Sequence, residues 1–211
     1  MLKVGLTGGM GVGKSHVCKI FTQLGCYVFD ADQVARDVVN PGNPGYEKVV
    51  AAFGQEILNS DGIIDRAQLG QIIFNDKTKR EKLNELLHPI IIDEQNKLML
   101  GVLAKDPQAI VIMDAALMIE TGSYKRFDKL IVVFCDQETQ IERVMKRNGF
   151  SRDQAEVRIK TQMPTEEKRR YADIEIDTSG SYEQTDKRVR EVYQELQALA
   201  ALHNSLFIKN K

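Results

Sequence analysis

The stretch Gly8-Gly-Met-Gly-Val-Gly-Lys14-Ser15 follows a short apolar run, Val4-Gly5-Leu6, and fits the pattern G-x-x-x-x-G-K-[ST]. Glycines in such a loop allow successive backbone N–H groups to turn inward around an anion. Lys14 is expected to reach the outer phosphates and act in catalysis, and the Ser15 hydroxyl is expected to ligate Mg²⁺. The residues expected to line the nucleotide phosphates are Gly8, Gly9, Gly11, Val12, Gly13, Lys14, Ser15 and His16, the last through its backbone N–H. The stretch predicts a strand, a loop and a helix that bind a nucleoside triphosphate.

The composition is that of an ordinary globular chain. Its 211 residues are 43% hydrophobic and 28% charged, and 29 Lys and Arg nearly balance 30 Asp and Glu. Because the formal net charge is −1, the protein has no overall electrostatic field that would attract nucleic acid or an anionic membrane. We expect neither partner, and apolar runs such as 109–113 are far shorter than the ~20 residues needed to span a bilayer.

The N-terminal residues and the cysteines indicate a cytoplasmic protein. The chain enters a strand at once, without a charged leader, an apolar core and a cleavage site. Its three cysteines, Cys18, Cys26 and Cys135, are far apart and show no C-x-x-C spacing. We interpret them as reduced thiols that serve packing, and no protein-bound transition metal is indicated.

Apolar patterning predicts an α/β fold of the P-loop NTPase type, in three layers, with a parallel sheet and helices on both faces. A helix is expected over 14–24, and a last helix over about 182–202 should cover one face of the sheet through Val189, Val192, Leu196 and Leu199. The expected strands are 2–6, 26–29, 110–113, 130–134 and 174–176.

About seventy residues between the second and third strands have helical spacing, over 33–39, 46–53, 67–74 and 77–103. We interpret residues 40–107 as a helical insertion that binds the acceptor substrate. The core would then comprise 1–39, 108–136 and 171–211, with a lid over 137–170. Pro89 restricts the residue before it, so one helical pattern is expected to end at His88 and another to start there. A histidine in that place is most often structural, and acceptor binding is its functional alternative.

Three aspartates follow predicted strands, where the carboxyl ends of a parallel sheet border the ligand crevice. Phosphoryl transfer to an alcohol requires a carboxylate that orients the hydroxyl and accepts its proton. We give this role to Asp32 and helix capping to Asp30, although either residue suits capping. Asp114 follows the apolar strand 110–113 and is expected to help hold Mg²⁺, although an aspartate there also suits a plain turn.

The segment 143–170 holds nine basic residues against four acidic ones. Most of them are expected to form a solvated helical face. Gln140, Arg143 and Arg147 recur at helical intervals, so they share one face of a helix. We predict that Arg143 acts in catalysis and that Arg147 binds the nucleotide phosphates, because guanidinium groups neutralise charge that develops on transferred phosphate.

Together these motifs resemble the dephospho-coenzyme A kinase family over nearly the whole chain. The residues that carry the resemblance are the loop from Gly5, Asp30-Ala-Asp32, Leu86-Leu-His88-Pro89-Ile90, Leu117-Met-Ile-Glu120 and Gln140 to Arg147. The resemblance implies ATP-dependent phosphorylation of the ribose 3′-hydroxyl of dephospho-coenzyme A, the last step to coenzyme A, with ATP and Mg²⁺. It also implies that Asp32 is the general base and that Asp32, His88, Leu117 and Glu120 bind the acceptor.

Two positions depart from the family pattern. Ala116 stands where the family usually has proline, so the wall around the acceptor is expected to differ in shape. Thr178 stands where the family often has asparagine, which removes a side-chain amide contact to the adenine. Gly180 and backbone groups are still expected to form the adenine loop.

Other interpretations remain open. One is a kinase for another small alcohol or a nucleoside monophosphate. Only the helical insertion distinguishes a dephospho-coenzyme A kinase from such an enzyme. A GTP-binding switch would need Asn-Lys-x-Asp, and Asn96-Lys97-Leu98-Met99 fails at its last position. A non-catalytic nucleotide-binding regulator is the third alternative. A monomer or weak homo-oligomer is expected.

Overall fold

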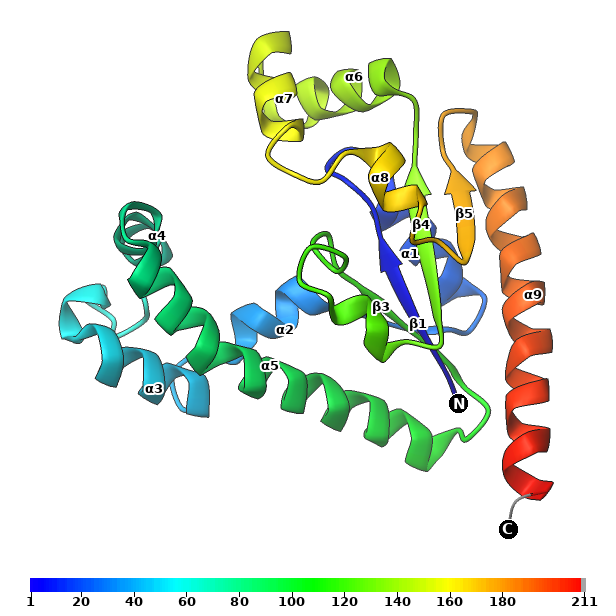
Figure 1. Cartoon of the computed structure of the whole chain (residues 1–211), viewed down its shortest axis with the longest axis horizontal. Coiled ribbons are helices and arrows are strands. Elements are labelled where there is room, and N and C mark those ends of the chain that lie inside the picture. Colours follow the sequence, from blue (N-terminus) through cyan, green and yellow to red (C-terminus); the bar gives the residue numbers. More distant parts are fainter. Residues whose placement is uncertain (210–211) are drawn as a thin grey trace. The chain divides into compact units, whose positions relative to one another are not determined.

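A five-stranded, all-parallel sheet is the centre of the computed structural model (Figure 1). The structure describes the backbone of residues 1–209 and the side chains of residues 1–202. The strand order is β2-β3-β1-β4-β5. The strands are β1 (Leu2–Thr7), β2 (Tyr27–Asp30), β3 (Ile110–Asp114), β4 (Lys129–Phe134) and β5 (Ile174–Asp177). The predicted fold class is confirmed, and each strand lies within two residues of its predicted bounds.

The strand register brings two of the predicted acidic positions together at the carboxyl edge of the sheet. Asp30 at the end of β2 pairs with Asp114 at the end of β3. Leu6 of β1 pairs with Asp114 as well. Because parallel strands end at the same edge, the loop that follows β1 emerges beside these carboxylates.

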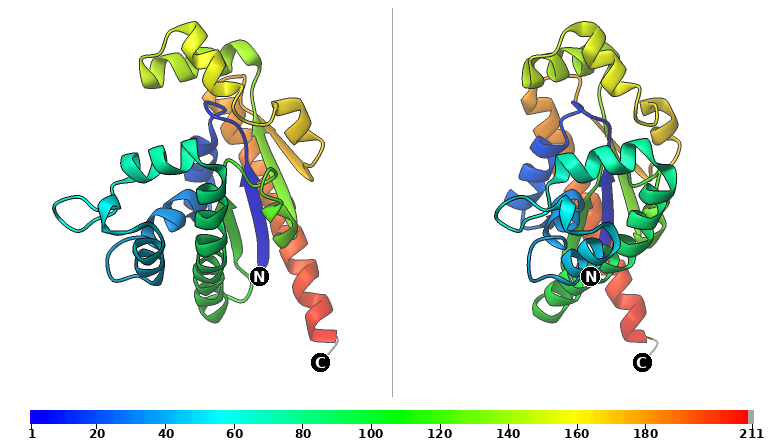
Figure 2. Two further views of the ribbon diagram at one scale, coloured as in Figure 1. Left: turned by 60° about the vertical axis from the view of Figure 1, so that its left-hand side comes forward. Right: turned by 90° about the vertical axis from the view of Figure 1, so that its left-hand side faces the viewer.

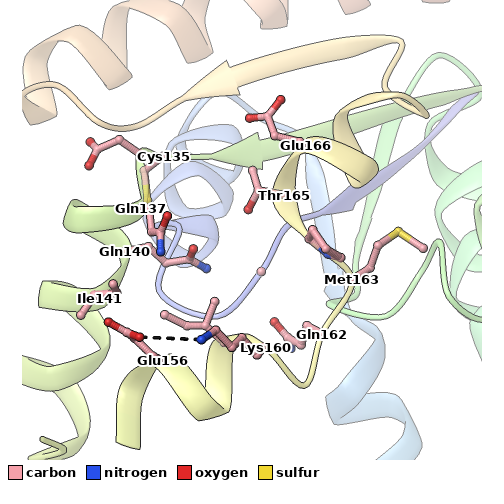
Figure 3. Close-up of a pocket in the computed structure, with 14 residues that line it drawn as sticks. Cys135, Gln137, Gln140, Ile141, Glu156, Lys160, Gln162, Met163, Thr165 and Glu166 are labelled. Carbon is pink, nitrogen blue, oxygen red and sulfur yellow. Dashed lines mark ion pairs between the residues drawn. The ribbon is translucent and has the colours of Figure 1, made fainter. Parts of the chain in front are cut away.

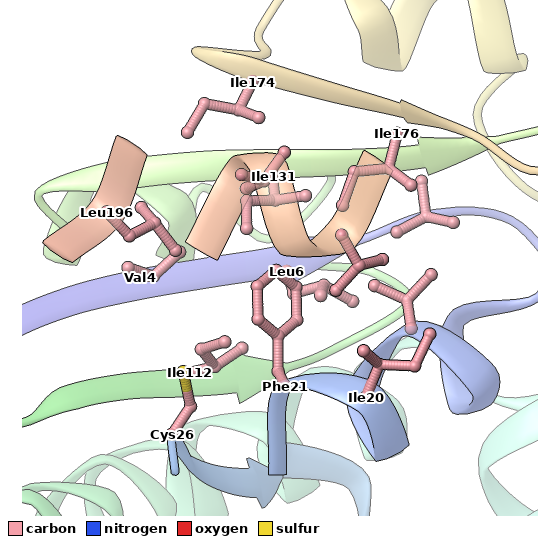
Figure 4. Close-up of a cluster of buried hydrophobic side chains, with 14 of the residues drawn as sticks. Val4, Leu6, Ile20, Phe21, Cys26, Ile112, Ile131, Ile174, Ile176 and Leu196 are labelled. Carbon is pink, nitrogen blue, oxygen red and sulfur yellow. The ribbon is translucent and has the colours of Figure 1, made fainter. Parts of the chain in front are cut away.

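One face of the sheet is covered by helices α1 (Lys14–Gln23) and α9 (Tyr182–Lys209). Figure 2 shows α9 running alongside the strands. The side chains of Leu6, Phe21, Ile131 and Leu196 are fully buried in this layer (Figure 4). The predicted apolar stripe of the last helix is therefore confirmed, since Val189, Val192 and Leu196 are fully buried and Leu199 packs against the cluster.

The opposite face of the sheet is covered by the segment that follows β3 and by the short helix α8 (Thr165–Arg169). A Cβ at Gly5 of β1 would lie 2.5 Å from Met118 Sδ and 3.2 Å from Phe127 Cδ2, so only glycine lets this segment approach the strand. The 3₁₀ turn η2 (Ser123–Arg126) leads from it into β4.

Helices α6 (Gln137–Asn148) and α7 (Arg152–Ile159) precede α8 and make up the predicted lid together with it. Asp136 caps α6 by accepting from the backbone N–H of Thr139 at 2.8 Å. Ser151 caps α7 in a reciprocal capping box with Gln154. Ile141, Val144 and Ala155 form a small buried cluster, so α6 and α7 pack on one another.

By its internal contacts the chain divides into a sheet unit, Met1–Asp30 with Val102–Lys211, and a helical unit, Ala31–Gly101. The division into a core, an acceptor-binding insertion and a lid stays a prediction. Residues 210–211 of the predicted core lie outside the described part of the chain. The helical unit contains α2 (Ala31–Asp37), α3 (Pro44–Phe53), the 3₁₀ turn η1 (Gln55–Ile57), α4 (Arg66–Asn75) and most of α5 (Lys77–Lys105). Its own core is built from Val49, Phe53, Ile57, Ile64, Leu69 and Leu83.

The predicted helix break at His88-Pro89 is wrong. Helix α5 is continuous from Lys77 to Lys105, with Pro89 inside it. A proline in a helix removes one backbone hydrogen bond, which tertiary packing of the flanking turns can offset. Leu83 and Leu87 pack into the helical unit's core before Pro89, and Met99 is buried after it. His88 lies exposed on this helix.

None of the helices in the described part of the chain combines the length and apolar character that a bilayer span requires.

Candidate nucleotide-binding and phosphoryl-transfer site

The predicted phosphate loop lies between the end of β1 at Thr7 and the start of α1 at Lys14. Gly13 occupies the position before the helix with φ of 87°, in the left-handed region. No described side chain caps α1, and its first turn carries no acidic residue. The positive end of the helix dipole is thus available to an anion, as the sequence predicts.

Close packing explains why this loop requires glycine. Gly11 has φ of 79°, and a Cβ there would lie 2.6 Å from Val144 Cγ2 on α6. At Gly8 a Cβ would overlap the backbone oxygen of Val133, and at Gly9 it would lie 3.0 Å from Gln140 Nε2. The loop is therefore in contact with β4 and with the first lid helix.

Two glutamines hold the Met10 residue of the loop. Gln140 on α6 donates from Nε2 to the Met10 carbonyl at 2.8 Å. Gln162, between α7 and α8, accepts from the Met10 N–H through Oε1 at 2.8 Å. Figure 3 shows both side chains directed at the loop. Sequence reasoning singled out Gln140 by its helical spacing but missed Gln162, which no local pattern marks.

These two glutamines border a cavity of ≈ 410 Å³ on the lid side of the phosphate loop (Figure 3). Gly9 forms part of its wall, and Cys135 and Met163 line it as well. Lys160 lies 3.8 Å from Glu156 at its edge. The cavity therefore borders the phosphate loop at Gly9.

Lys14 and Asp114 meet at the carboxyl edge of the sheet. Lys14 Nζ lies 4.0 Å from Asp114 Oδ1, and the two side chains are 16% and 20% exposed. Ser15 and Asp114 offer a hydroxyl and a carboxylate oxygen, the hard ligands that Mg²⁺ prefers. Because Mg²⁺ keeps several waters and takes ligands from substrate phosphates, two protein oxygens are enough. The donor set fits the predicted role, although the structure describes no cluster of three or more His, Cys, Asp or Glu side chains arranged for a metal.

The three thiols are protonated and serve packing. Burial raises the pKa of Cys18 far above its usual range, and the Asp114 carboxylate, 3.7 Å from its Sγ, adds to this rise. Burial also raises the pKa of Cys26 to about 12 and that of Cys135 to about 11. A thiol is nucleophilic only as the thiolate, so these cysteines are inert near neutral pH.

Arg143 is half-buried and contacts Thr178, the residue that follows β5. Its guanidinium donates from Nη1 to Thr178 Oγ1 at 3.0 Å and from Nη2 to the Thr178 carbonyl at 2.8 Å. Thr178 Oγ1 in turn donates to the Val12 carbonyl of the phosphate loop at 2.7 Å. Arg147 is exposed, and its Nε donates to Asn148 at 3.1 Å. The structure thus brings Arg143 to the loop through Thr178, and the phosphate contacts of both arginines stay predictions.

Glu120 pairs with a buried lysine. Lys168 on α8 is 1% exposed and donates to both Glu120 carboxylate oxygens, at 2.7 and 2.9 Å, and to the Ala116 carbonyl at 2.8 Å. Glu120 also accepts from the Met163 N–H at 3.3 Å. The expectation of a solvated basic face is therefore wrong for Lys168, because the carboxylate that compensates it comes from a distant segment. Leu117 is 48% exposed on that segment.

His16 and Gly180 lie near the start of α9. His16 Nε2 is 2.7 Å from Asp186, and the ring contacts Tyr182 edge-on at 4.8 Å. The backbone N–H of His16 donates to the Gly13 carbonyl at 3.1 Å. Gly180 lies in the loop between β5 and α9, where Ser181 and Gln184 cap the helix by exchanging hydrogen bonds. Nucleotide contacts of His16 and Gly180 stay predictions.

Asp32 lies in the first turn of α2, two residues along the chain from the end of β2. It belongs to the helical unit, as does His88. The strand register fixes Asp30 next to Asp114, so the chain leaves the carboxyl edge of the sheet immediately before Asp32. The role of Asp32 as general base stays a prediction, as does capping by Asp30.

Comparison with known proteins identifies the family. The family model described as Dephospho-CoA kinase matches residues 2–184. Dephospho-CoA kinase from Aquifex aeolicus is 46% identical over 196 residues, which cover 93% of this chain and 98% of that protein. Dephospho-CoA kinase from Geobacter sulfurreducens is 45% identical over 190 residues, covering 90% and 96%. The solved dephospho-CoA kinase from Campylobacter jejuni superposes with a TM-score of 0.70 at 28% identity, over 93% of this chain and 97% of that one.

The matched region includes the phosphate loop, the carboxyl edge of the sheet with Asp114, and the lid residues that contact the loop. With a match over most of its length to the family model and to relatives above 40% identity, the chain belongs to the dephospho-CoA kinase family.

Proposed function

We propose that the protein transfers the γ-phosphoryl group of ATP to the ribose 3′-hydroxyl of dephospho-coenzyme A, giving coenzyme A and ADP. Family membership supports this activity and gives no support to another alcohol acceptor, a nucleoside monophosphate acceptor or a non-catalytic switch. The observation that carries the proposal is the uncapped N-terminus of α1 with Lys14 beside Asp114. That arrangement suits a polyanion accompanied by a divalent cation.

In this proposal the phosphates of ATP bind along Gly8 to Ser15. Ser15 and Asp114 would hold Mg²⁺, which would neutralise phosphate charge when bound. Lys14 contributes a second, fixed positive charge, since its ammonium lies at the same edge. Arg143 supports the loop from α6, and Arg147 completes the charge around the phosphates by movement of the lid.

The acceptor hydroxyl attacks the γ-phosphorus. A bond forms between the 3′-oxygen and phosphorus, while the bond from phosphorus to the β–γ bridging oxygen breaks and leaves ADP. Asp32 orients the hydroxyl and accepts its proton. His88, Leu117 and Glu120 are the residues proposed to contact the acceptor, Glu120 while paired with Lys168.

We propose the cytoplasm as the place of the reaction and a monomer or weak homo-oligomer as the active form. The protonated thiols agree with a reducing compartment, because none of the described cysteines is bridged.

The experiment is a coupled assay of ADP release with Mg·ATP and a panel of dephospho-coenzyme A, adenosine monophosphate and pantothenate. With Mg·ATP present, we expect turnover with dephospho-coenzyme A and none with adenosine monophosphate or pantothenate. Phosphorus NMR of the product should locate the new phosphate on the 3′-oxygen. Lys14→Ala should abolish turnover, whereas Lys19→Ala, an exposed lysine on the same helix, should not. Turnover that prefers another acceptor, or that survives Lys14→Ala, would overturn the proposal.

A further inference from the structure

Thr178 connects three separate parts of the sheet unit. It follows β5 directly and is 3% exposed. Its hydroxyl lies 2.7 Å from the Val12 carbonyl in the phosphate loop, 3.2 Å from the Phe134 carbonyl at the end of β4, and 3.0 Å from Arg143 Nη1 on α6. The family often has asparagine at this position. The adenine contact expected of that asparagine therefore does not account for the buried threonine hydroxyl found here.

The hydrogen-bond directions are fixed by chemistry. A guanidinium only donates, so Thr178 Oγ1 accepts from Arg143. The hydroxyl has one proton, which the shorter distance assigns to the Val12 carbonyl. Arg143 also donates to the Thr178 carbonyl at 2.8 Å, which holds the threonine from both sides.

This contact determines which way one peptide of the loop points. In a trans peptide the C=O and the N–H point in opposite directions. Because the Val12 carbonyl is turned to Thr178, the Gly13 N–H is turned to the other side of that peptide. Gly13 itself lies against Thr178, because a Cβ built on Gly13 would be 3.3 Å from Thr178 Oγ1. The hydroxyl therefore works against rotation of the Val12–Gly13 peptide, which the glycine at 13 would otherwise allow.

We propose that Thr178 is a positioning residue for the phosphoryl donor: its hydroxyl, oriented by Arg143, fixes the Val12–Gly13 peptide so that the Gly13 N–H faces the phosphates of ATP. The inference rests on the proposed function and adds a residue to its machinery. Thr178 touches no reacting atom and acts through the loop.

The test compares Thr178→Val, which keeps the volume and removes the hydroxyl, with Thr178→Ser, which keeps the hydroxyl. Thr178→Ala serves as a second variant without the hydroxyl if the valine variant does not fold. Thr185→Val is the matched control, because Thr185 is also 3% exposed and its hydroxyl donates only to the Ser181 carbonyl, at 3.2 Å, among the bonds described. Steady-state kinetics with both substrates, ATP binding by calorimetry and Tm are measured for each variant.

We expect Thr178→Val to lower kcat/KM for ATP about 10- to 100-fold, because a buried carbonyl and an Arg143 N–H lose their partner. The KM for dephospho-coenzyme A should stay close to that of the wild type. Thr178→Ser should recover most of the activity. Thr178→Val should have a lower Tm than Thr185→Val, because the Thr178 hydroxyl has more partners, but it should remain fully folded at the assay temperature, so that the loss of kcat/KM exceeds what unfolding accounts for.

Three results would overturn the inference: a Thr178→Val variant as active as Thr185→Val, a serine variant as impaired as the valine variant, or a loss that follows Tm alone. A wild-type protein without ADP release would instead refute the proposed function, so the two failures can be told apart.

Discussion

The buried pair of Lys168 and Glu120 predicts an asymmetry between two nearly isosteric substitutions. Lys168 is 1% exposed, whereas Glu120 is 24% exposed. Glu120→Gln leaves a buried ammonium group without its counter-charge. Lys168→Met leaves a carboxylate that water still reaches and to which the Met163 N–H still donates. The first change should therefore cost more stability than the second.

The magnitudes follow from the burial of each group. Removing one partner of a buried ion pair costs about 3–5 kcal/mol when the remaining charge is uncompensated, so this is the expected loss for Glu120→Gln. The expected loss for Lys168→Met is about 1.5–3 kcal/mol, the range for hydrogen bonds to charged groups, and its lower end is expected because water still reaches the Glu120 carboxylate. The double variant should be more stable than Glu120→Gln alone, because it carries no unpaired buried charge.

Urea unfolding followed by circular dichroism measures the three free energies of unfolding. For a chain of this size each kcal/mol lowers Tm by about 2–4 °C, so Glu120→Gln should lower it by about 6–20 °C. Glu138→Gln breaks an exposed pair with Arg152 and should leave Tm unchanged within error. If Lys168→Met proves the more destabilising variant, or Glu120→Gln resembles Glu138→Gln, the reasoning from burial is refuted.

Three further predictions concern the site and the thiols. Asp32→Asn should lower kcat by ~10²–10⁴ while calorimetric ATP affinity stays constant, and an equal loss of both would assign Asp32 to the metal. Gly11→Ala should weaken ATP binding at least tenfold, because its Cβ would meet Val144 Cγ2 at 2.6 Å. Gly42→Ala, with a similar left-handed φ and open space, should leave binding unchanged. Burial raises the pKa of Cys135 from 9.0 to about 11, so its contribution to stability is complete below pH 9 and is lost as pH rises to 11. Urea unfolding at a series of pH values from 9 to 11 should show a smaller fall in the free energy of unfolding for Cys135→Ala than for the wild type. An equal fall in the two proteins would contradict this prediction.

Much of the fold follows from local patterns. The glycine loop predicts β1 and α1, because the spacing of its glycines, lysine and serine has one common structural solution. Apolar runs without alternation predict buried parallel strands, and the aspartates that end β2 and β3 fall where parallel strands finish together. The helical insertion was predictable because its periodicity is 3.6 and not 2.

Local rules failed where a distant contact outweighs them. The break expected at Pro89 depends on one lost hydrogen bond, which the packing of Leu83 and Leu87 offsets. The solvated face expected for residues 143–170 ignores Glu120, which lies 48 residues before Lys168. No rule based on neighbouring residues reports such a partner.

The sequence by itself determined that a nucleoside triphosphate site with a lysine, a serine and acidic strand ends is present, because these features depend on short spacings and strand periodicity. Only the tertiary structure decided how the loop is held. Gln162 is 152 residues from Met10, and Thr178 is 166 residues from Val12, and both meet the loop because the lid and β5 pack beside it. Hydrogen bonds of a few ångströms depend on where distant segments lie in space, and the spacing of neighbours along the chain carries no information about that.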